Sequence, residues 1–221
     1  MRKDIFKVID HTLLRQDITA AELASHCAEA REFGFCSVVV QPLHVGTAAK
    51  LLEGSGVIAG TVVGFPFGEE HSEVKSYQAR LAESLGAGEV DMVMAVSLAK
   101  QGKWEEVAAD IRAVTSAVSV PVKVIIETSL LTAEEIKLAC EACISGGAAF
   151  VKTSTGYFGQ GATAENVALM KSVCGERIRI KAAGGVRSLA DIEAMLNAGA
   201  DRIGTSAGAK IARGGEAAGG Y

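Results

Sequence analysis

Two lysine residues stand where their side chains could do chemistry. Lys152 ends an apolar run in Ala-Phe-Val-Lys-Thr-Ser-Thr-Gly, and Lys181 does so in Ile-Arg-Ile-Lys-Ala-Ala-Gly-Gly-Val-Arg. Such a run followed by a glycine-bearing loop is typical of the C-terminal end of a buried parallel strand. Burial and a second ammonium group nearby both lower the pKa of a lysine, which favours the neutral, nucleophilic amine. The pair therefore indicates amine catalysis.

The elements that must position these lysines alternate between strand and helix along the chain. Stretches between the strands carry helix start signals, as in Thr19-Ala-Ala-Glu22 and Thr132-Ala-Glu-Glu135, which match the capping box. Glycines follow the predicted helices as C-terminal caps would require, at Gly34, Gly86, Gly146 and Gly199. Eight short apolar strands are predicted near Val8–His11, Cys36–Gln41, Val57–Gly64, Glu89–Met94, Val122–Glu127, Ala149–Thr153, Ile178–Ala183 and Asp201–Thr205.

Eight strand–helix units without a linker predict an α/β fold, a single-domain (β/α)₈ TIM barrel over residues 1–212, followed by a flexible tail over residues 213–221. The alternative is a doubly wound open sheet, which is disfavoured because no Gly-x-Gly-x-x-Gly follows the first strand. Active sites of barrels lie at the C-terminal ends of the strands. The candidate polar residues on or near that face are Asp10, Asp91, Glu127, Lys152 and Lys181.

Neighbouring strands six and seven would hold Lys152 and Lys181 on backbones about 4.8 Å apart, close enough for each to sense the other's charge. Strand lysines also occur simply as partners of acidic groups. Lys123, two residues into its predicted strand, fits that second role, paired with Asp91 or Asp10.

Composition excludes several classes of partner. The 221 residues are 49% hydrophobic and carry a net charge of −4 without a block of like charge, so we expect no binding to nucleic acid or to anionic membranes. The N-terminal residues lack the apolar segment of a signal peptide, and five cysteines in no framework spacing fit a reducing compartment, so a cytoplasmic protein is expected. Four scattered histidines and the Cys140/Cys143 pair, which falls within a predicted helix, predict no metal site, although distant ligands could still converge.

Glycine-rich turns after strands seven and eight supply a second signal. Such turns expose backbone amides, and barrels commonly hold a phosphate at this place. The hydroxyl groups and amides that follow Lys152 could add to the same site. The predicted phosphate-binding residues are Thr155, Gly156, Gly184, Gly185, Gly204, Thr205 and Ser206. A phosphorylated carbonyl compound is therefore the expected substrate.

These residues resemble a known enzyme family. The chain is similar to the class I deoxyribose-phosphate aldolases from Ile9-Asp-His-Thr-Leu-Leu14 to its end. The matching stretches are Thr61-Val-Val-Gly-Phe-Pro66, Glu89-Val-Asp-Met-Val93, Lys123-Val-Ile-Ile-Glu-Thr128, Phe150-Val-Lys-Thr-Ser-Thr-Gly156, Lys181-Ala-Ala-Gly-Gly-Val-Arg187 and Arg202-Ile-Gly-Thr-Ser206.

The resemblance implies reversible cleavage of 2-deoxy-D-ribose 5-phosphate into D-glyceraldehyde 3-phosphate and acetaldehyde, with no metal or organic cofactor. It implies that Lys152 forms the Schiff base, that Lys181 relays protons, and that Asp91 shuttles a proton. Asp10 is expected to orient this network. A terminal tyrosine, Tyr221, is expected to help protonate the enamine, as in some relatives with a similar tail. Relatives are often homodimers, and a homodimer is expected here.

Three departures from the family pattern concern contacts with the substrate. Gln41 stands where Asn or Tyr is expected, Val39 where many members carry a cysteine, and Tyr157 where some carry a lysine. Two other functions stay open at this point. Another phosphate-binding barrel enzyme, such as an isomerase, would not need two lysines at strand ends, and a non-catalytic sugar-phosphate sensor would be expected to have lost a member of the lysine–aspartate set.

Overall fold

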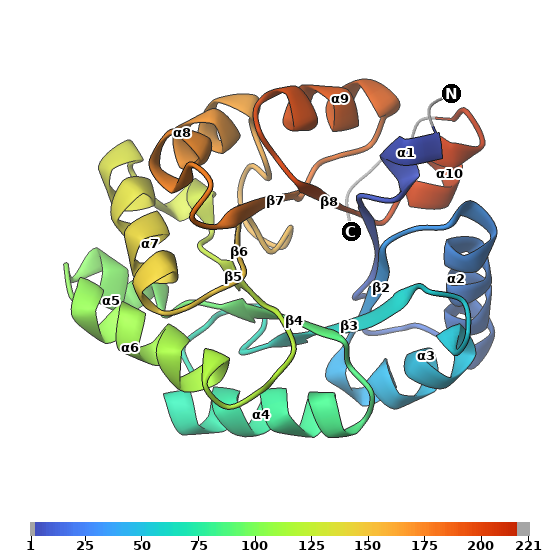
Figure 1. Ribbon diagram of the computed structural model, residues 1–221, viewed down its shortest axis with the longest axis horizontal. Coiled ribbons are helices and arrows are strands. Elements are labelled where there is room, and N and C mark those ends of the chain that lie inside the picture. The colour runs from blue at the N-terminus through green and yellow to red at the C-terminus, as the bar shows by residue number, and fades with distance from the viewer. Residues whose placement is uncertain (1–2, 216–221) are drawn as a thin grey trace.

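The strands close into a barrel in the order of the sequence. The structure is a computed structural model that describes residues 3–215. Within this range all neighbouring strands pair in parallel, and the last strand pairs with the first (Figure 1). The strands are β1 Ile9–Leu13, β2 Ser37–Val40, β3 Ile58–Val63, β4 Glu89–Val93, β5 Val122–Ile125, β6 Phe150–Lys152, β7 Arg179–Ala183 and β8 Arg202–Thr205. The predicted (β/α)₈ barrel is confirmed, and the open sheet is excluded.

Helices surround the barrel on its outside (Figure 1). They are α1 Lys3–Phe6, α2 Ala20–Phe33, α3 Val45–Leu52, α4 Ser72–Ser84, α5 Val96–Lys100, α6 Trp104–Thr115, α7 Ala133–Ser145, α8 Ala164–Cys174, α9 Leu189–Asn197 and α10 Gly208–Ala212, with 3₁₀ turns η1 Pro42–His44 and η2 Thr128–Leu130. Within residues 3–215, none of these helices has both the length and the apolar character that a membrane crossing requires.

The predicted helix signals act as expected at most positions. Thr19 and Thr132 each form a reciprocal capping box with the glutamate three residues later. Gly34 ends α2 in the left-handed conformation, with φ of 66°. Gly146 differs, because its φ is −77° and the left-handed residue is the next glycine. At Gly146 the packing leaves no room for a side chain, because a Cβ atom there would lie 2.5 Å from Cγ2 of Ile111.

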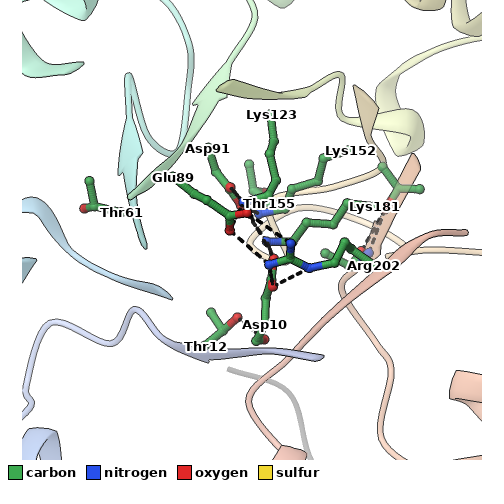
Figure 2. A network of polar contacts seen from close by, with 12 residues as sticks. Asp10, Thr12, Thr61, Glu89, Asp91, Lys123, Lys152, Thr155, Lys181 and Arg202 are labelled. Atoms are coloured by element: carbon green, nitrogen blue, oxygen red, sulfur yellow. Dashed lines mark hydrogen bonds and ion pairs between the residues drawn. The ribbon is translucent and has the colours of Figure 1, made fainter. Parts of the chain in front are cut away.

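The two faces of the barrel strands have different chemistry. In β4, Val90 and Met92 belong to the apolar core between the sheet and the helices. Glu89 and Asp91 alternate with them and are buried inside the barrel. The same alternation turns Lys123, Lys152 and Lys181 inward, so much of the barrel interior is filled by charged side chains (Figure 2).

The first strand extends further than predicted, to Leu13 instead of His11. Asp10 is therefore the second residue of β1, aligned with Ser37 at the start of β2. Asp10 was predicted to lie on or near the C-terminal face, and it lies three residues before the end of β1, where its carboxylate contacts Lys181.

Candidate active site

One carboxylate joins the two lysines that the sequence singled out. Oδ2 of Asp91 lies 2.9 Å from Nζ of Lys152 and 2.7 Å from Nζ of Lys181 (Figure 2). All three side chains are buried in the barrel. An amine, a carboxylate and a second ammonium group thus form one continuous hydrogen-bonded unit.

Strand register explains why these residues meet. Lys152 is the last residue of β6, and its aligned partner in β7 is Lys181, so the predicted proximity of the two lysines is confirmed. Ile125 of β5 aligns with Lys152, and Lys123, two residues earlier, aligns with Asp91 of β4. Because side chains two residues apart point to the same face, Asp91, Lys123, Lys152 and Lys181 all turn into the barrel.

A second set of charged groups lies beside the first. Nζ of Lys181 is 2.5 Å from Oδ2 of Asp10. The other oxygen of Asp10, Oδ1, accepts a hydrogen bond from the guanidinium of Arg202. Arg202 in turn donates to both carboxylate oxygens of Glu89, at 3.0 and 2.9 Å. Asp10 therefore contacts Lys181, as its expected orienting role requires.

Lys123 completes this set. Its Nζ lies 2.6 Å from Glu89, 3.2 Å from Asp91 and 3.8 Å from Asp10. The predicted pairing with Asp91 or Asp10 is confirmed, but the nearest partner is Glu89, which was not predicted to pair with Lys123. Lys123 bridges the acidic groups and makes no contact with the amine of Lys152 within hydrogen-bonding reach among the described interactions.

Burial and neighbouring charges give the two lysines opposite pKa shifts. Burial lowers the pKa of Lys152 to about 8, an effect that Asp91 opposes and Lys181 reinforces. Burial acts on Lys181 in the same direction, but Asp10 and Asp91 outweigh it and leave its pKa raised. Lys152 can therefore lose its proton near neutral pH, while Lys181 stays an ammonium group.

The acidic groups are held ionised. Burial by itself raises the pKa of Asp91, but the ammonium groups of Lys123, Lys152 and Lys181 outweigh burial and hold that pKa well below its usual range. The pKa of Asp10 is lowered in the same way, mainly by Lys181. In the described network, three carboxylates face four cations. Loss of one proton from Lys152 therefore leaves the network electrically balanced.

The predicted phosphate loops meet at the mouth of the barrel, but the hydroxyl groups of Thr155 and Thr205 are engaged internally. The amide and the hydroxyl of Thr155 both donate to Glu127. The hydroxyl of Thr205 donates to the carbonyl of Val186. The glycine turns are the better candidates for binding phosphate, since Gly184 and Gly185 both have positive φ, at 87° and 76°.

Other predicted loop residues have a packing role or lie at the surface. A Cβ atom on Gly204 would lie 3.1 Å from Cε of Lys181, so this glycine makes room for the lysine inside the barrel. Ser206 is exposed and lies next to α10. Gly156 is left-handed, with φ of 87°, and lies against Gly184. Tyr221 lies outside the described residues.

A cluster that could be considered for a metal lies outside the barrel. His11, His26 and Glu29 bring three ligand atoms within 4.8 Å of one another. The two imidazole rings stack in parallel, however, with centroids 3.5 Å apart and an angle of 8° between the planes. Ring nitrogens bind metals along lone pairs in the plane of the ring, and two parallel planes cannot both contain one ion. The stack therefore does not form a metal site in this arrangement. The Cys140/Cys143 pair lies in α7 as predicted, and both thiols are free and buried.

A parallel (β/α)₈ barrel that holds a low-pKa lysine, a carboxylate and an ammonium group in its interior contains the groups that an aldolase with a lysine nucleophile would use. Comparison with known proteins agrees. Residues 5–214 match the model of the DeoC/LacD family aldolases, and the chain belongs to this family.

Similar proteins match nearly the full length. The chain is 50% identical to the deoxyribose-phosphate aldolase of Deinococcus radiodurans, covering 96% of this chain and 97% of that protein. It is 48% identical to the deoxyribose-phosphate aldolase of Halalkalibacterium halodurans over 100% of both chains. The solved structure of the tetrameric deoxyribose phosphate aldolase from Aeropyrum pernix is 33% identical, with a TM-score of 0.87, covering 96% of this chain and 90% of that one.

Two members of the charged network, Glu89 and Arg202, were not identified from the sequence. Both stand at the first position of a buried strand, two residues before an inward-facing position. A charge at an inward position of an otherwise apolar strand was the signal that could have found them.

Proposed function

We propose that the chain catalyses reversible cleavage of 2-deoxy-D-ribose 5-phosphate into D-glyceraldehyde 3-phosphate and acetaldehyde, in the catabolism of deoxyribonucleotides. The observation that carries the proposal is the carboxylate of Asp91 between Lys152 and Lys181. This arrangement provides a nucleophilic amine and a proton relay within one hydrogen-bonded unit. Neither an isomerase nor a sugar-phosphate sensor requires such a unit.

Lys152 begins the reaction as a neutral amine. Its nitrogen attacks the aldehyde carbon C1 of the open-chain sugar, and loss of water with uptake of one proton gives an iminium ion. The lowered pKa of Lys152 supplies the neutral amine, of which about a tenth is present at pH 7 for a pKa of about 8. Lys181 remains charged beside it and opposes reprotonation of the amine.

Cleavage then moves one proton and one electron pair. The C3 hydroxyl gives its proton to the network of Asp91 and Lys181, and the electrons of the C2–C3 bond move to the iminium nitrogen. D-glyceraldehyde 3-phosphate leaves, and an enamine of acetaldehyde stays on Lys152. The network returns a proton to C2, and water then releases acetaldehyde and the free amine. Because the two lysines contact the same oxygen of Asp91, a single hydrogen bond connects Asp91 to each lysine, and a proton can pass along either one.

Phosphate is proposed to bind at the glycine turns near the ends of β7 and β8, with Gly184 and Gly185 offering amides. The remaining residues of this site, Thr155, Gly156, Gly204, Thr205 and Ser206, shape the loops and the space around Lys181. No metal or organic cofactor is proposed to take part, since the iminium ion itself withdraws the electrons.

Reduction with borohydride in the presence of acetaldehyde tests the proposal. The imine between acetaldehyde and one amine is an obligatory intermediate, so reduction is expected to leave a stable ethyl adduct on Lys152 and to abolish activity. Peptide mapping by mass spectrometry locates the adduct. A modification confined to Lys181, or labelling of surface lysines with activity intact, would overturn the assignment.

We also propose a cytoplasmic homodimer. The five cysteines are free, which fits a reducing compartment. The relative from Aeropyrum pernix is described as a tetramer, so assembly varies from the expected dimer among similar proteins. Sedimentation equilibrium is expected to give twice the mass of the 221-residue chain.

A further inference from the structure

Glu127 has an unusual backbone conformation close to the candidate active site. It follows β5 directly, with φ of 53° and ψ of 69°. Among the described residues it is the only non-glycine residue with positive φ. The left-handed region is unfavourable for residues other than glycine, and residues that are held there cluster at functional sites. Some interaction of the Glu127 side chain must therefore hold the conformation.

The carboxylate of Glu127 binds the loop that follows the Schiff-base lysine. Its Oε2 accepts hydrogen bonds from the amide of Thr155 at 3.1 Å and from the hydroxyl of Thr155 at 2.5 Å. Glu127 and Thr155 are each only 1% exposed. A buried carboxylate that accepts two donors from one residue fixes the place of that residue strongly. The residue that follows β5 thus holds the loop over residues 153–163 at Thr155, three residues after Lys152.

The held loop packs against the turn proposed for phosphate. The amide of Ala162 donates to the carbonyl of Gly184 at 2.9 Å. A Cβ atom on Gly161 would lie 2.2 Å from that carbonyl oxygen, and a Cβ atom on Gly184 would lie 3.4 Å from Cα of Gly156. Backbone therefore packs directly on backbone, and a shift of the loop cannot leave the Gly184 turn unmoved.

The loop continues across the mouth of the barrel. The hydroxyl of Thr155 accepts a hydrogen bond from the amide of Tyr157 at 3.1 Å. The phenol of Tyr157 donates to the carbonyl of Leu14 at 2.9 Å, beyond the end of β1. Glu127 is therefore the fixed end of a chain of hydrogen bonds that runs from the β5 side of the barrel to the β1 side.

We propose that Glu127 is a positioning residue for the phosphate end of the substrate. Its carboxylate sets the loop over residues 153–163 against the Gly184 turn, so that the amides of the turn face the phosphate. Lys152 and Asp91 lie below the loop and are held by the strands, so their chemistry does not depend on Glu127. This inference rests on the proposed function, because it assigns a role in binding the phosphate of that substrate.

Replacement of Glu127 separates phosphate binding from amine chemistry. Glu127→Gly removes the carboxylate and relieves the left-handed backbone, and Glu127→Gln keeps the side-chain length but loses the charge. The measurements are kcat/KM for 2-deoxy-D-ribose 5-phosphate, kcat/KM for unphosphorylated 2-deoxy-D-ribose, and the rate of borohydride trapping of acetaldehyde. The ratio of the two kcat/KM values is expected to fall about tenfold or more in Glu127→Gly, as loss of hydrogen bonds to a charged acceptor predicts. The trapping rate is expected to change less than about twofold.

Thr155→Val provides a second route to the same test should Glu127→Gly fail to fold. It removes the hydroxyl donor and keeps the backbone amide, and a selective loss for the phosphorylated sugar is again expected. Glu135→Gln is the matched control, since Glu135 accepts a hydrogen bond from the backbone amide of Thr132 at 2.7 Å outside the site. It is expected to leave the selectivity ratio unchanged.

Two results would overturn the inference. Equal losses for both sugars would mean that Glu127 supports the whole barrel and not the phosphate end, and an unchanged ratio would mean that the loop does not set the turn. The failure of the proposed function looks different, because the parent protein itself would then show neither cleavage nor an adduct with acetaldehyde.

Discussion

Removal of the Lys181 ammonium group should raise the pKa of Lys152. Both Nζ atoms contact Oδ2 of Asp91, at 2.9 and 2.7 Å, so they are at most about 5.6 Å apart. Two like charges at this distance repel by at least about 3 kcal/mol at an effective dielectric constant of 20. This corresponds to about two pKa units. Lys181→Leu removes the repulsion and also leaves Asp91 with one cation fewer, which acts in the same direction.

The expected consequence is a displaced pH profile. The pKa of Lys152 is about 8 in the parent, and a rise of about two units makes the neutral amine about a hundredfold scarcer near pH 7. The rate of borohydride-trapped imine formation with acetaldehyde is therefore expected to level off near pH 8 in the parent and about two units higher in Lys181→Leu. Sugar cleavage is expected to fall further than imine formation, because the variant also lacks the proton relay.

A matched variant separates this effect from general loss of a buried cation. Lys75 is as deeply buried as Lys181 and pairs with Asp110 at 2.8 Å, between α4 and α6 outside the barrel interior. Lys75→Met is expected to lower the free energy of unfolding but to leave the midpoint of imine formation near that of the parent. If Lys181→Leu keeps the parent midpoint while its circular dichroism spectrum stays native, the two lysines are not coupled and the electrostatic reasoning fails.

Three further outcomes are expected. EDTA is expected to leave turnover unchanged, because the iminium ion polarises the substrate without a metal; lost activity that added zinc restores would place the protein in the metal-dependent class. Tyr221→Phe is expected to lower turnover while Schiff-base formation and thermal stability stay near those of the parent. Proton exchange at the acetaldehyde methyl carbon is expected to be slower in this variant. Exchange at the parent rate would mean that the C-terminal tail takes no part in the mechanism. Burial lowers the pKa of His26 to about 3, so its contribution to stability is present above its usual pKa of 6.5 and is lost as the pH falls from there towards 3. His26→Leu is accordingly expected to weaken the dependence of the unfolding free energy on pH in this window by about one proton, as denaturant titrations at several pH values would show.

The sequence predicted those features that depend on local order along the chain. Alternating strands and helices defined the barrel, and the barrel defined which ends of the strands face the site. Because parallel register aligns Lys152 with Lys181, their meeting also followed from strand order. Their opposite pKa shifts did not, since these depend on Asp10 and Asp91, which contribute differently to each lysine.

Contacts between distant segments explain what could not be predicted. The bond between Arg202 and Glu89 joins residues 113 positions apart. Thr155 was predicted to bind phosphate because hydroxyl groups after a strand often serve that role. In the structure its amide and its hydroxyl both donate to Glu127 instead. Gly204 was predicted to bind phosphate as part of a glycine-rich turn, whereas its place inside the barrel leaves space for the side chain of Lys181. Each of these roles is set by a neighbour in space and not by a neighbour in sequence.

The charged interior has a consequence for how the site is maintained. A buried charge that loses its partner is strongly destabilising, whereas apolar side chains of similar volume often replace a whole buried ion pair without loss of stability. For stability alone, an apolar barrel core could therefore replace Glu89, Arg202 and Lys123. What an apolar core could not provide is the fixed charge around Asp10 and Asp91. Lys123 helps to hold both carboxylates ionised, and Arg202 helps to hold Asp10 ionised. The ionised carboxylates keep Lys181 protonated, and the protonated Lys181 favours the neutral amine of Lys152. Lys123 and Arg202 thus act on Lys152 through a sequence of charge contacts, each of which shifts a pKa.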